Sequence, residues 1–172
     1  MKFKMIPGIG LILLILLVSW PTTSDAGLFK VVRVYDGDTV KAVGHDIEIR
    51  VRLVGIDAPE TSKKKHEPGQ PFGRKAEKYL AGLVLNRVVD IKGYGSDRYG
   101  RILAEIYIEE KNINLEMVKT GYAEVYHGNP PRGLYMKEYR KAEDRARTSG
   151  QGIWSQGDEY MSPALWRRKS KM

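Results

Sequence analysis

Cysteine is absent from the 172 residues of this sequence. Disulfide bonds, thiolate nucleophiles and zinc sites built from cysteine are therefore excluded, and the fold must be held by packing alone. Histidine is scarce as well, and no pair among His45, His66 and His127 has the spacing of a metal site, so we expect these residues in exposed loops. The chain also lacks internal repeats and any composition shift that would suggest a second large domain.

Long apolar runs are missing except at the N-terminus, which reads MKFKMIPGIGLILLILLVSWPTTSDAG. Two lysines precede the apolar run, and Ser24 and Ala26 are small residues placed for cleavage, which is the layout of a secretory signal. The run is short for a bilayer span, which needs about 20 apolar residues. We predict a signal peptide over residues 1–26 and export to the extracellular space or a periplasm, with an uncleaved N-terminal membrane anchor as the alternative.

Acidic residues are outnumbered by basic ones, 21 to 29, which gives a net charge of +8. Without residues 1–26, which contain two lysines and one aspartate, the net charge is still +7. A small exported protein with this surplus is expected to meet a polyanion, either nucleic acid or an anionic cell surface. Charge alone does not separate these two partners.

The apolar pattern predicts five strands, one helix between the third and fourth, and helices after the fifth. The expected strands cover 28–35, 39–43, 45–56, 87–95 and 101–108, and the expected helices cover 73–86, about 114–121 and 134–148. This order favours an α+β, mainly β protein, a small closed barrel with appended helices, over an alternating βαβ fold. The segment 61–71 reads as a polar loop, and residues 156–172 read as a basic, loose tail.

Two acidic clusters interrupt this pattern. Asp36 and Asp38 flank Gly37 between the first two strands, where a tight turn is the simplest interpretation. Asp57 follows the third strand, 19 residues after Asp38, so both carboxylates can lie at one rim of the barrel. Such carboxylates, with a main-chain carbonyl and waters, would form a hard oxygen site for calcium or magnesium, and the spacing excludes an EF-hand loop.

A basic cluster, DRYGR at 97–101, places Arg98 and Arg101 in a turn between strands. Taken alone it is typical of a solvated turn. Combined with Glu60, Arg52 and a divalent ion, it supplies what phosphodiester hydrolysis needs: positive charge for the phosphorane and a carboxylate for water. Arginine suits this task because its planar fork binds two phosphate oxygens.

Over roughly residues 28–155 the chain resembles the thermonuclease family, typified by staphylococcal nuclease. The resemblance is carried by DGDTV, RLVGIDAPE and DRYGRILAEIY in that order, with a near match GIWS at 152–155. It implies a five-stranded OB-fold barrel with three helices, formed by residues 27–155.

The resemblance also implies one calcium ion per chain. Asp38 and Asp57 match the calcium-binding carboxylates of the family, and the main-chain carbonyl of Ala58 matches a further ligand. Family members often have threonine where Ala58 stands, but the carbonyl is the ligating group. Asp36 and Thr39 match groups that orient the ligands.

Six further residues are expected at the catalytic and substrate-binding positions. Glu60 corresponds to the general base, and Arg52 and Arg101 correspond to the two phosphate-binding arginines. Arg98, Tyr99 and Tyr126 are expected to contact the nucleotide, with base stacking on the tyrosines; the alternative for the tyrosines is core packing.

Together, the N-terminal signal and the resemblance predict a secreted, monomeric, calcium-dependent endonuclease. It would hydrolyse single- and double-stranded DNA and RNA with little sequence preference and leave 3′-phosphate ends, with no protein partner. The alternative is a non-catalytic OB-fold module that binds nucleic acid. Retention of Asp38, Asp57, Glu60, Arg52 and Arg101 favours catalysis.

Overall fold

The computed structural model describes residues 27–62 and 67–170. The expected signal peptide, His66 and part of the 61–71 loop lie outside the described residues. Within the described part, no helix has the length and apolar character needed to cross a membrane.

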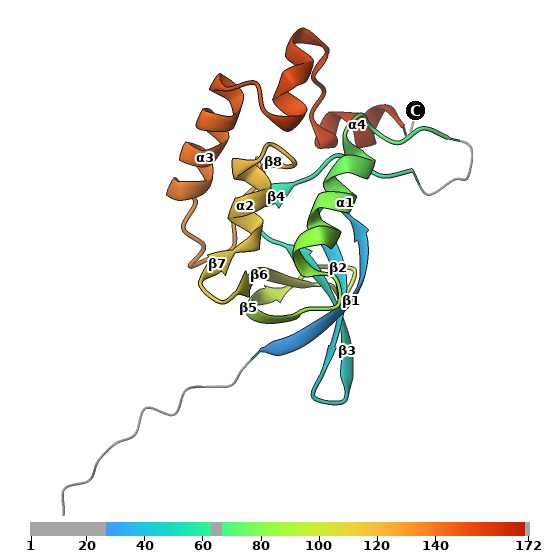
Figure 1. Cartoon of the computed structure of the whole chain (residues 1–172), viewed down its shortest axis with the longest axis vertical. Helices are drawn as coiled ribbons and strands as arrows, with labels where there is room; N and C mark the ends of the chain where they lie inside the picture. The colour runs from blue at the N-terminus through green and yellow to red at the C-terminus, as the bar shows by residue number, and fades with distance from the viewer. Residues whose placement is uncertain (1–26, 63–66, 171–172) are drawn as a thin grey trace, which may run out of the picture.

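Five strands form a closed barrel of mixed direction, which Figure 1 shows below most of the helices. The strands are β1 (Leu28–Asp36), β2 (Thr39–Gly44), β3 (Ile47–Leu53), β5 (Val88–Ser96) and β6 (Ile102–Ile108). Antiparallel neighbours run in the order β3-β2-β1-β5-β6, and a parallel pairing of β3 with β6 closes the sheet. The predicted α+β, mainly β class and the five-stranded OB-like barrel are confirmed.

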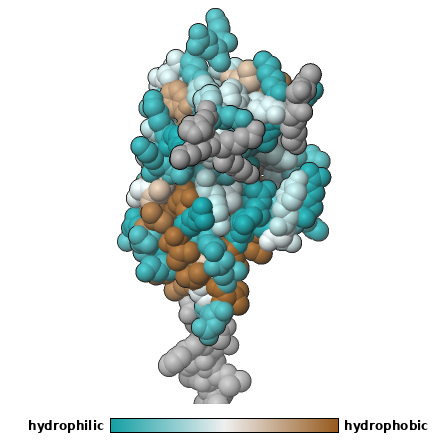
Figure 2. Space-filling view, turned by 90° about the vertical axis from the view of Figure 1, so that its right-hand side faces the viewer, coloured by the Kyte–Doolittle hydropathy of each residue, from teal (hydrophilic) through white to brown (hydrophobic). Residues whose placement is uncertain are grey.

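The barrel core follows from strand alternation. Val31, Val40 and Val51 are fully buried on the inner face of their strands. Neighbours along each strand, such as Lys30, Lys41 and Arg50, lie on the outer face and are more exposed. Some apolar side chains remain outside, including Ile47 and Val88, which are 55% and 58% exposed. Figure 2 shows hydrophobic side chains gathered over the barrel end of one face, with a hydrophilic surface above them.

Helices and short strands fill the space above the barrel. The helices are α1 (Gly73–Val84), α2 (Ile113–Lys119), α3 (Lys137–Thr148), the 3₁₀ helix η1 (Gly152–Glu159) and α4 (Pro163–Lys169), and the short strands are β4 (Ile56–Asp57), β7 (Lys111–Asn112) and β8 (Glu124–Val125). The sequence predicted three helices, and α1, α2 and α3 correspond to them. The expected strand 45–56 is interrupted because Gly55 turns the chain at φ 81°, after which β4 pairs with β8.

The basic tail expected to be loose is folded over residues 156–170 in the structure. The end of η1 and all of α4 lie in it, and Figure 1 shows α4 close to the upper end of α1. The side chain of Ser162 accepts a hydrogen bond from the amide of Leu165 at 3.2 Å, and Pro163 occupies the first turn of α4. A capping serine followed by proline is a typical helix start.

Candidate active site

The Asp-Gly-Asp segment is a tight turn between β1 and β2. The Asp38 amide donates to Oδ1 of Asp36 at 3.1 Å, which is the local bond that favours aspartate in turns. A Cβ at Gly37 would lie 2.6 Å from Cβ of Ala58 and 2.8 Å from Cβ of Ala76. The glycine therefore lets the turn approach both the 57–60 segment and α1.

Two carboxylates from separate elements meet beside this turn. Asp38 and Asp57 are each only 2% exposed. Asp38 accepts hydrogen bonds from the Ala58 amide at 2.9 Å and from the Thr39 hydroxyl at 3.0 Å. The guanidinium of Arg52 bridges the pair, with Nη1 on Asp38 and Nη2 on Oδ1 of Asp57 at 2.9 Å. The structure thus brings together the residues that the sequence placed at one barrel rim.

Asp36 and Thr39 flank the pair and support it. Thr39 holds Asp38 through its hydroxyl, and Asp36 holds the turn through the Asp38 amide. Burial raises the pKa of Asp36, although the charge of Arg52 opposes this rise. Both residues are therefore hydrogen-bonded to Asp38, one at its amide and one at its carboxylate.

Glu60 extends from a loop that packs on the start of α1. Gln70 fixes this loop: its side-chain oxygen accepts from the Glu60 amide at 3.2 Å, and its own amide donates to the Glu60 carbonyl at 2.9 Å. A Cβ at Gly73 would lie 2.4 Å from the same carbonyl, so only glycine fits there. The backbone around Glu60 is therefore positioned by tertiary contacts and not by a strand.

A further charged residue enters the site from the C-terminal helix. Arg167 of α4 donates from Nη2 to Oδ2 of Asp57 at 2.7 Å, and from Nη1 to Oδ1 of Asp57 at 3.0 Å and Oε1 of Glu60 at 2.6 Å. Hydrogen bonds to Asp57 raise the pKa of Arg167. The guanidinium therefore holds the two carboxylates together.

Sequence reasoning missed Arg167 because it lies 110 residues from Asp57 in a segment expected to be loose. The Ser162-Pro163 pair was the available signal, since it predicts a helix start just ahead of the WRRK run. That signal predicts the helix, but it does not reveal where the helix docks.

The second phosphate-binding candidate, Arg101, lies in the β5–β6 turn. Asp97 holds it through Nε and Nη2, both at 2.7 Å from Oδ2. Burial would raise the pKa of Asp97, but hydrogen bonds from the Arg101 backbone and side chain outweigh it and lower the pKa. Tyr99 is 66% exposed in the same turn, and the Arg98 guanidinium lies 4.9 Å from its ring centre.

Tyr126 follows β8, the strand that pairs with β4. Its amide donates to the Gly55 carbonyl at 3.0 Å, and its side chain is 44% exposed. Tyr99 and Tyr126 are thus both on the surface, so the core-packing alternative is excluded for these two residues.

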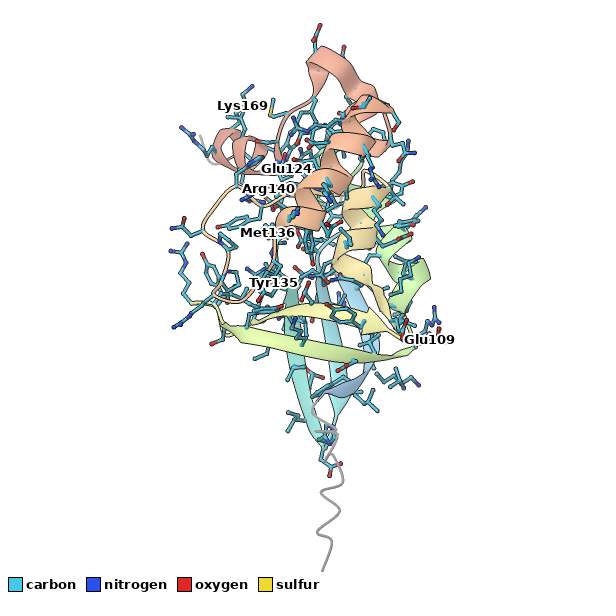
Figure 3. All side chains as sticks on the ribbon, turned by 90° about the vertical axis from the view of Figure 1, so that its left-hand side faces the viewer. Glu109, Glu124, Tyr135, Met136, Arg140 and Lys169 are labelled. Carbon is cyan, nitrogen blue, oxygen red and sulfur yellow. The ribbon has the colours of Figure 1, made fainter. Side chains whose placement is uncertain are left out.

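Behind the site lies a buried carboxylate that the sequence did not single out, Glu124 of β8. It is directly opposite Asp57 in the β4–β8 pair and 1% exposed. The Tyr160 hydroxyl donates to it, and burial raises its pKa. Figure 3 shows Glu124 at the level of the C-terminal helices, above Tyr135. The hydrogen bond from Tyr160, the residue after η1, joins this end of the 3₁₀ helix to β8.

The donor set fits a hard divalent cation in chemistry. Asp38, Asp57 and the carbonyl of Ala58 offer oxygen ligands, which calcium prefers. Among residues 27–62 and 67–170, no three His, Asp or Glu side chains are arranged to hold a metal ion. Arg52 and Arg167 supply the positive charge that the buried carboxylates of this donor set require.

The chain is similar in sequence to known proteins along most of its length. A family model described as staphylococcal nuclease homologue matches residues 50–156. A protein of Haemophilus influenzae named uncharacterized endonuclease is 36% identical over 162 residues, which cover 94% of this chain and 84% of the relative. A protein of Shigella flexneri named micrococcal nuclease is 37% identical over 167 residues, which cover 91% and 89%.

The matched segment contains Arg52, Asp57, Glu60 and Arg101, and both relatives span nearly the whole chain. This protein therefore belongs to the staphylococcal nuclease family.

Proposed function

We propose that this protein is a calcium-dependent nuclease that hydrolyses phosphodiester bonds in DNA and RNA with little sequence preference. The observation that carries the proposal is the convergence of Asp38 and Asp57 on one guanidinium, with Glu60 tied to Asp57 through Arg167. The endonuclease and nuclease names of the relatives support the same chemistry.

The ion would be held by Asp38, Asp57 and the main-chain carbonyl of Ala58. When bound, it supplies positive charge beside the reacting phosphate. Asp36 and Thr39 keep Asp38 in place, because each makes a hydrogen bond to its backbone or side chain.

Glu60 accepts a proton from the attacking water, whose oxygen forms a bond to phosphorus. The bond from phosphorus to the 5′ oxygen breaks, and that oxygen takes up a proton, which leaves a 3′-phosphate and a 5′-hydroxyl. Arg52 and Arg101 stabilise the charge that develops on the phosphate oxygens. Asp97 keeps the Arg101 fork in a fixed plane for this contact.

The proposed substrate range follows from the chemistry of the surface. Phosphate contacts dominate affinity and carry no sequence information. Exposed Tyr99 and Tyr126 offer rings on which any base can stack, and Arg98 adds a cation beside Tyr99. We further propose that the protein acts as an exported monomer after removal of residues 1–26, with membrane tethering as the alternative.

The test is digestion of duplex DNA, denatured DNA and RNA by residues 27–172, with calcium, magnesium or excess chelator. We expect cleavage of all three substrates with calcium and none with chelator, and 3′-phosphate ends by end-labelling. Full activity in chelator would overturn the metal assignment. Binding without cleavage under every condition would favour the non-catalytic OB-fold module.

A further inference from the structure

A row of basic residues crosses the outer face of the barrel next to the site. Arg33 of β1 lies directly opposite Lys41 of β2, and Lys41 lies directly opposite Arg50 of β3. Like charges that face each other across strands destabilise a sheet. Lys41 is paired with Glu48 at 2.7 Å, whereas Arg33 and Arg50 are exposed. Folding alone gives no reason for this row.

The two arginines of the row share one aromatic ring. The guanidinium carbons of Arg33 and Arg50 lie 4.8 Å and 5.1 Å from the ring centre of Tyr35. These three residues line a cavity of about 560 Å³, together with Arg74 of α1 and with Arg101. A tyrosine ring flanked by two guanidiniums combines a stacking surface with phosphate donors.

The cavity borders the candidate active site. Its lining includes Asp36 and Thr39, which hold Asp38, and Arg101 from the β5–β6 turn. Arg50 precedes Arg52 by two residues on β3, so the two side chains lie on the same face of the sheet, with their backbone positions about 6.6 Å apart along the strand. The Arg50 end of the basic row therefore lies next to Arg52, a proposed phosphate-binding residue, and the row extends away from Arg52 across the sheet.

We propose that Arg33, Tyr35 and Arg50 form a subsite for single-stranded nucleic acid next to the bond that is cut. Arg33 and Arg50 bind backbone phosphates, and Tyr35 supports an unstacked base. This proposal rests on the proposed function, and it adds a place for nucleotides beyond the reacting phosphate.

The test measures binding without cleavage, in excess chelator, by fluorescence anisotropy of labelled oligothymidylates of three and twelve nucleotides. For Arg33→Gln/Arg50→Gln we expect affinity for the long strand to fall at least tenfold and affinity for the short strand to change little. Loss of two phosphate contacts would reduce the slope of log K against log salt by about 1.4. Tyr35→Ala should weaken binding of the long strand without changing that slope.

The matched control is Arg140→Gln/Arg145→Gln, which removes two exposed charges from α3. An unchanged slope in the Arg33/Arg50 variant, or an equal loss in the control, would overturn the subsite. A wild type that binds as expected but never cleaves would refute the proposed catalysis and leave the subsite standing.

A second observation, the docking of α4, carries an inference of its own. Within α4 only Pro163 is buried and Leu165 is 42% exposed, so apart from the half-buried Trp166 little apolar surface holds the helix in place. The contacts that reach the site are those of Arg167 to Asp57 and Glu60. Just before α4, the Gln70 side chain donates to the Met161 carbonyl at 2.6 Å.

Arg167 and a cation bound by Asp57 require the same oxygens. Arg167 contacts both oxygens of Asp57 and one oxygen of Glu60. Removing a partner from a buried carboxylate is strongly unfavourable, but exchanging one cation for another keeps the charge paired. A helix with little apolar burial adds little resistance to that exchange.

We propose that Arg167 is a built-in competitor of the metal: α4 blocks Asp57 and Glu60 until calcium displaces its guanidinium. The readout is calcium binding without substrate, measured by titration calorimetry. For Arg167→Gln we expect the calcium Kd to fall at least tenfold. Arg168→Gln, an exposed neighbour on the same helix, should bind calcium like the wild type.

Limited trypsin digestion gives a second readout, because calcium should speed cleavage at Arg168 and Lys169 when α4 is released. Equal or weaker calcium binding by Arg167→Gln, or protection of α4 by calcium, would overturn the competition. If neither protein bound calcium, the metal assignment itself would fall, and the competition with it.

Discussion

Arg52 is the residue at which the two halves of the site meet. It belongs to β3 but contacts Asp38 from the β1–β2 turn and Asp57 from β4. Its side chain is 17% exposed, so its charge acts where water screens it little. Arg101 instead depends on Asp97, within one turn of the chain. The two proposed phosphate-binding residues are thus positioned by different means, one by long-range contacts and one locally.

Substitution of Glu60 or Arg101 should abolish most activity while the fold is retained. We expect Glu60→Gln and Arg101→Ala each to lower kcat by about 10² or more, because each removes a group that acts on the transition state. Circular dichroism and the thermal midpoint should match the wild type within a few degrees. Glu110→Gln, an exposed carboxylate, serves as the control. Wild-type turnover in either variant would remove that residue from the mechanism.

At the scale of elements, one buried carboxylate joins β5, β6 and α3. Glu105 of β6 accepts hydrogen bonds from Tyr94 at 2.5 Å, Tyr139 at 2.8 Å, Asn112 at 2.8 Å and Lys92 at 3.2 Å. Burial alone would raise the pKa of Glu105, but the hydrogen bonds from Tyr94, Tyr139 and Asn112 outweigh it and lower the pKa. The charged form is therefore the one that the folded state stabilises.

Glu105→Gln should lower the free energy of unfolding by about 2 to 3 kcal/mol at pH 7, because a buried charged acceptor with several donors is lost. A carboxyl with a lowered pKa stabilises the fold above its unfolded pKa, and this contribution disappears as the pH falls through the folded pKa. The advantage of the wild type over the variant should therefore begin to decrease below about pH 4.5 and continue to fall as the pH is lowered further. Urea unfolding at several pH values, with Glu110→Gln as control, measures both effects. A constant difference at all pH values would contradict this role.

At the scale of the whole molecule, residue 27 is the first described residue after the expected signal peptide, and it already contacts the barrel. The carbonyl of Gly27 accepts a hydrogen bond from the Ile91 amide at 3.0 Å, so residue 27 already belongs to the barrel. A Cβ at Gly27 would lie 2.8 Å from the Ile91 carbonyl oxygen, so residue 27 must be small. Removal of residues 1–26 would leave every strand of the barrel intact.

The protein recovered outside the cytoplasm of an expressing bacterium should therefore start at Gly27. N-terminal sequencing and intact mass of the extracellular and periplasmic fractions provide the measurement. Ala26→Arg, which places a large charged residue at the expected cleavage site, should leave the protein uncleaved in the membrane fraction. A wild-type protein that retains Met1 in the membrane fraction would instead support the anchor.

The sequence by itself determined the barrel and most of the candidate site. Strand alternation, the turn residues and helical spacing are local signals, so they predicted five strands and the helices α1, α2 and α3 in order. The motifs around Asp38, Asp57 and Arg101 lie at strand ends and turns, where position along the chain implies position in a barrel.

Tertiary structure decided which charges meet. The ion pairs of Arg167 with Asp57 and Glu60 join residues more than 100 positions apart. The spacing of apolar residues along the chain gives no information on contacts between such distant residues. The same holds for Glu124, which lies opposite Asp57, because strands of two residues such as β4 and β8 are too short to show an alternation of apolar and polar residues. The conformational preferences of neighbouring residues determine where helices and strands form, whereas the pairing of buried charges depends on how those helices and strands pack.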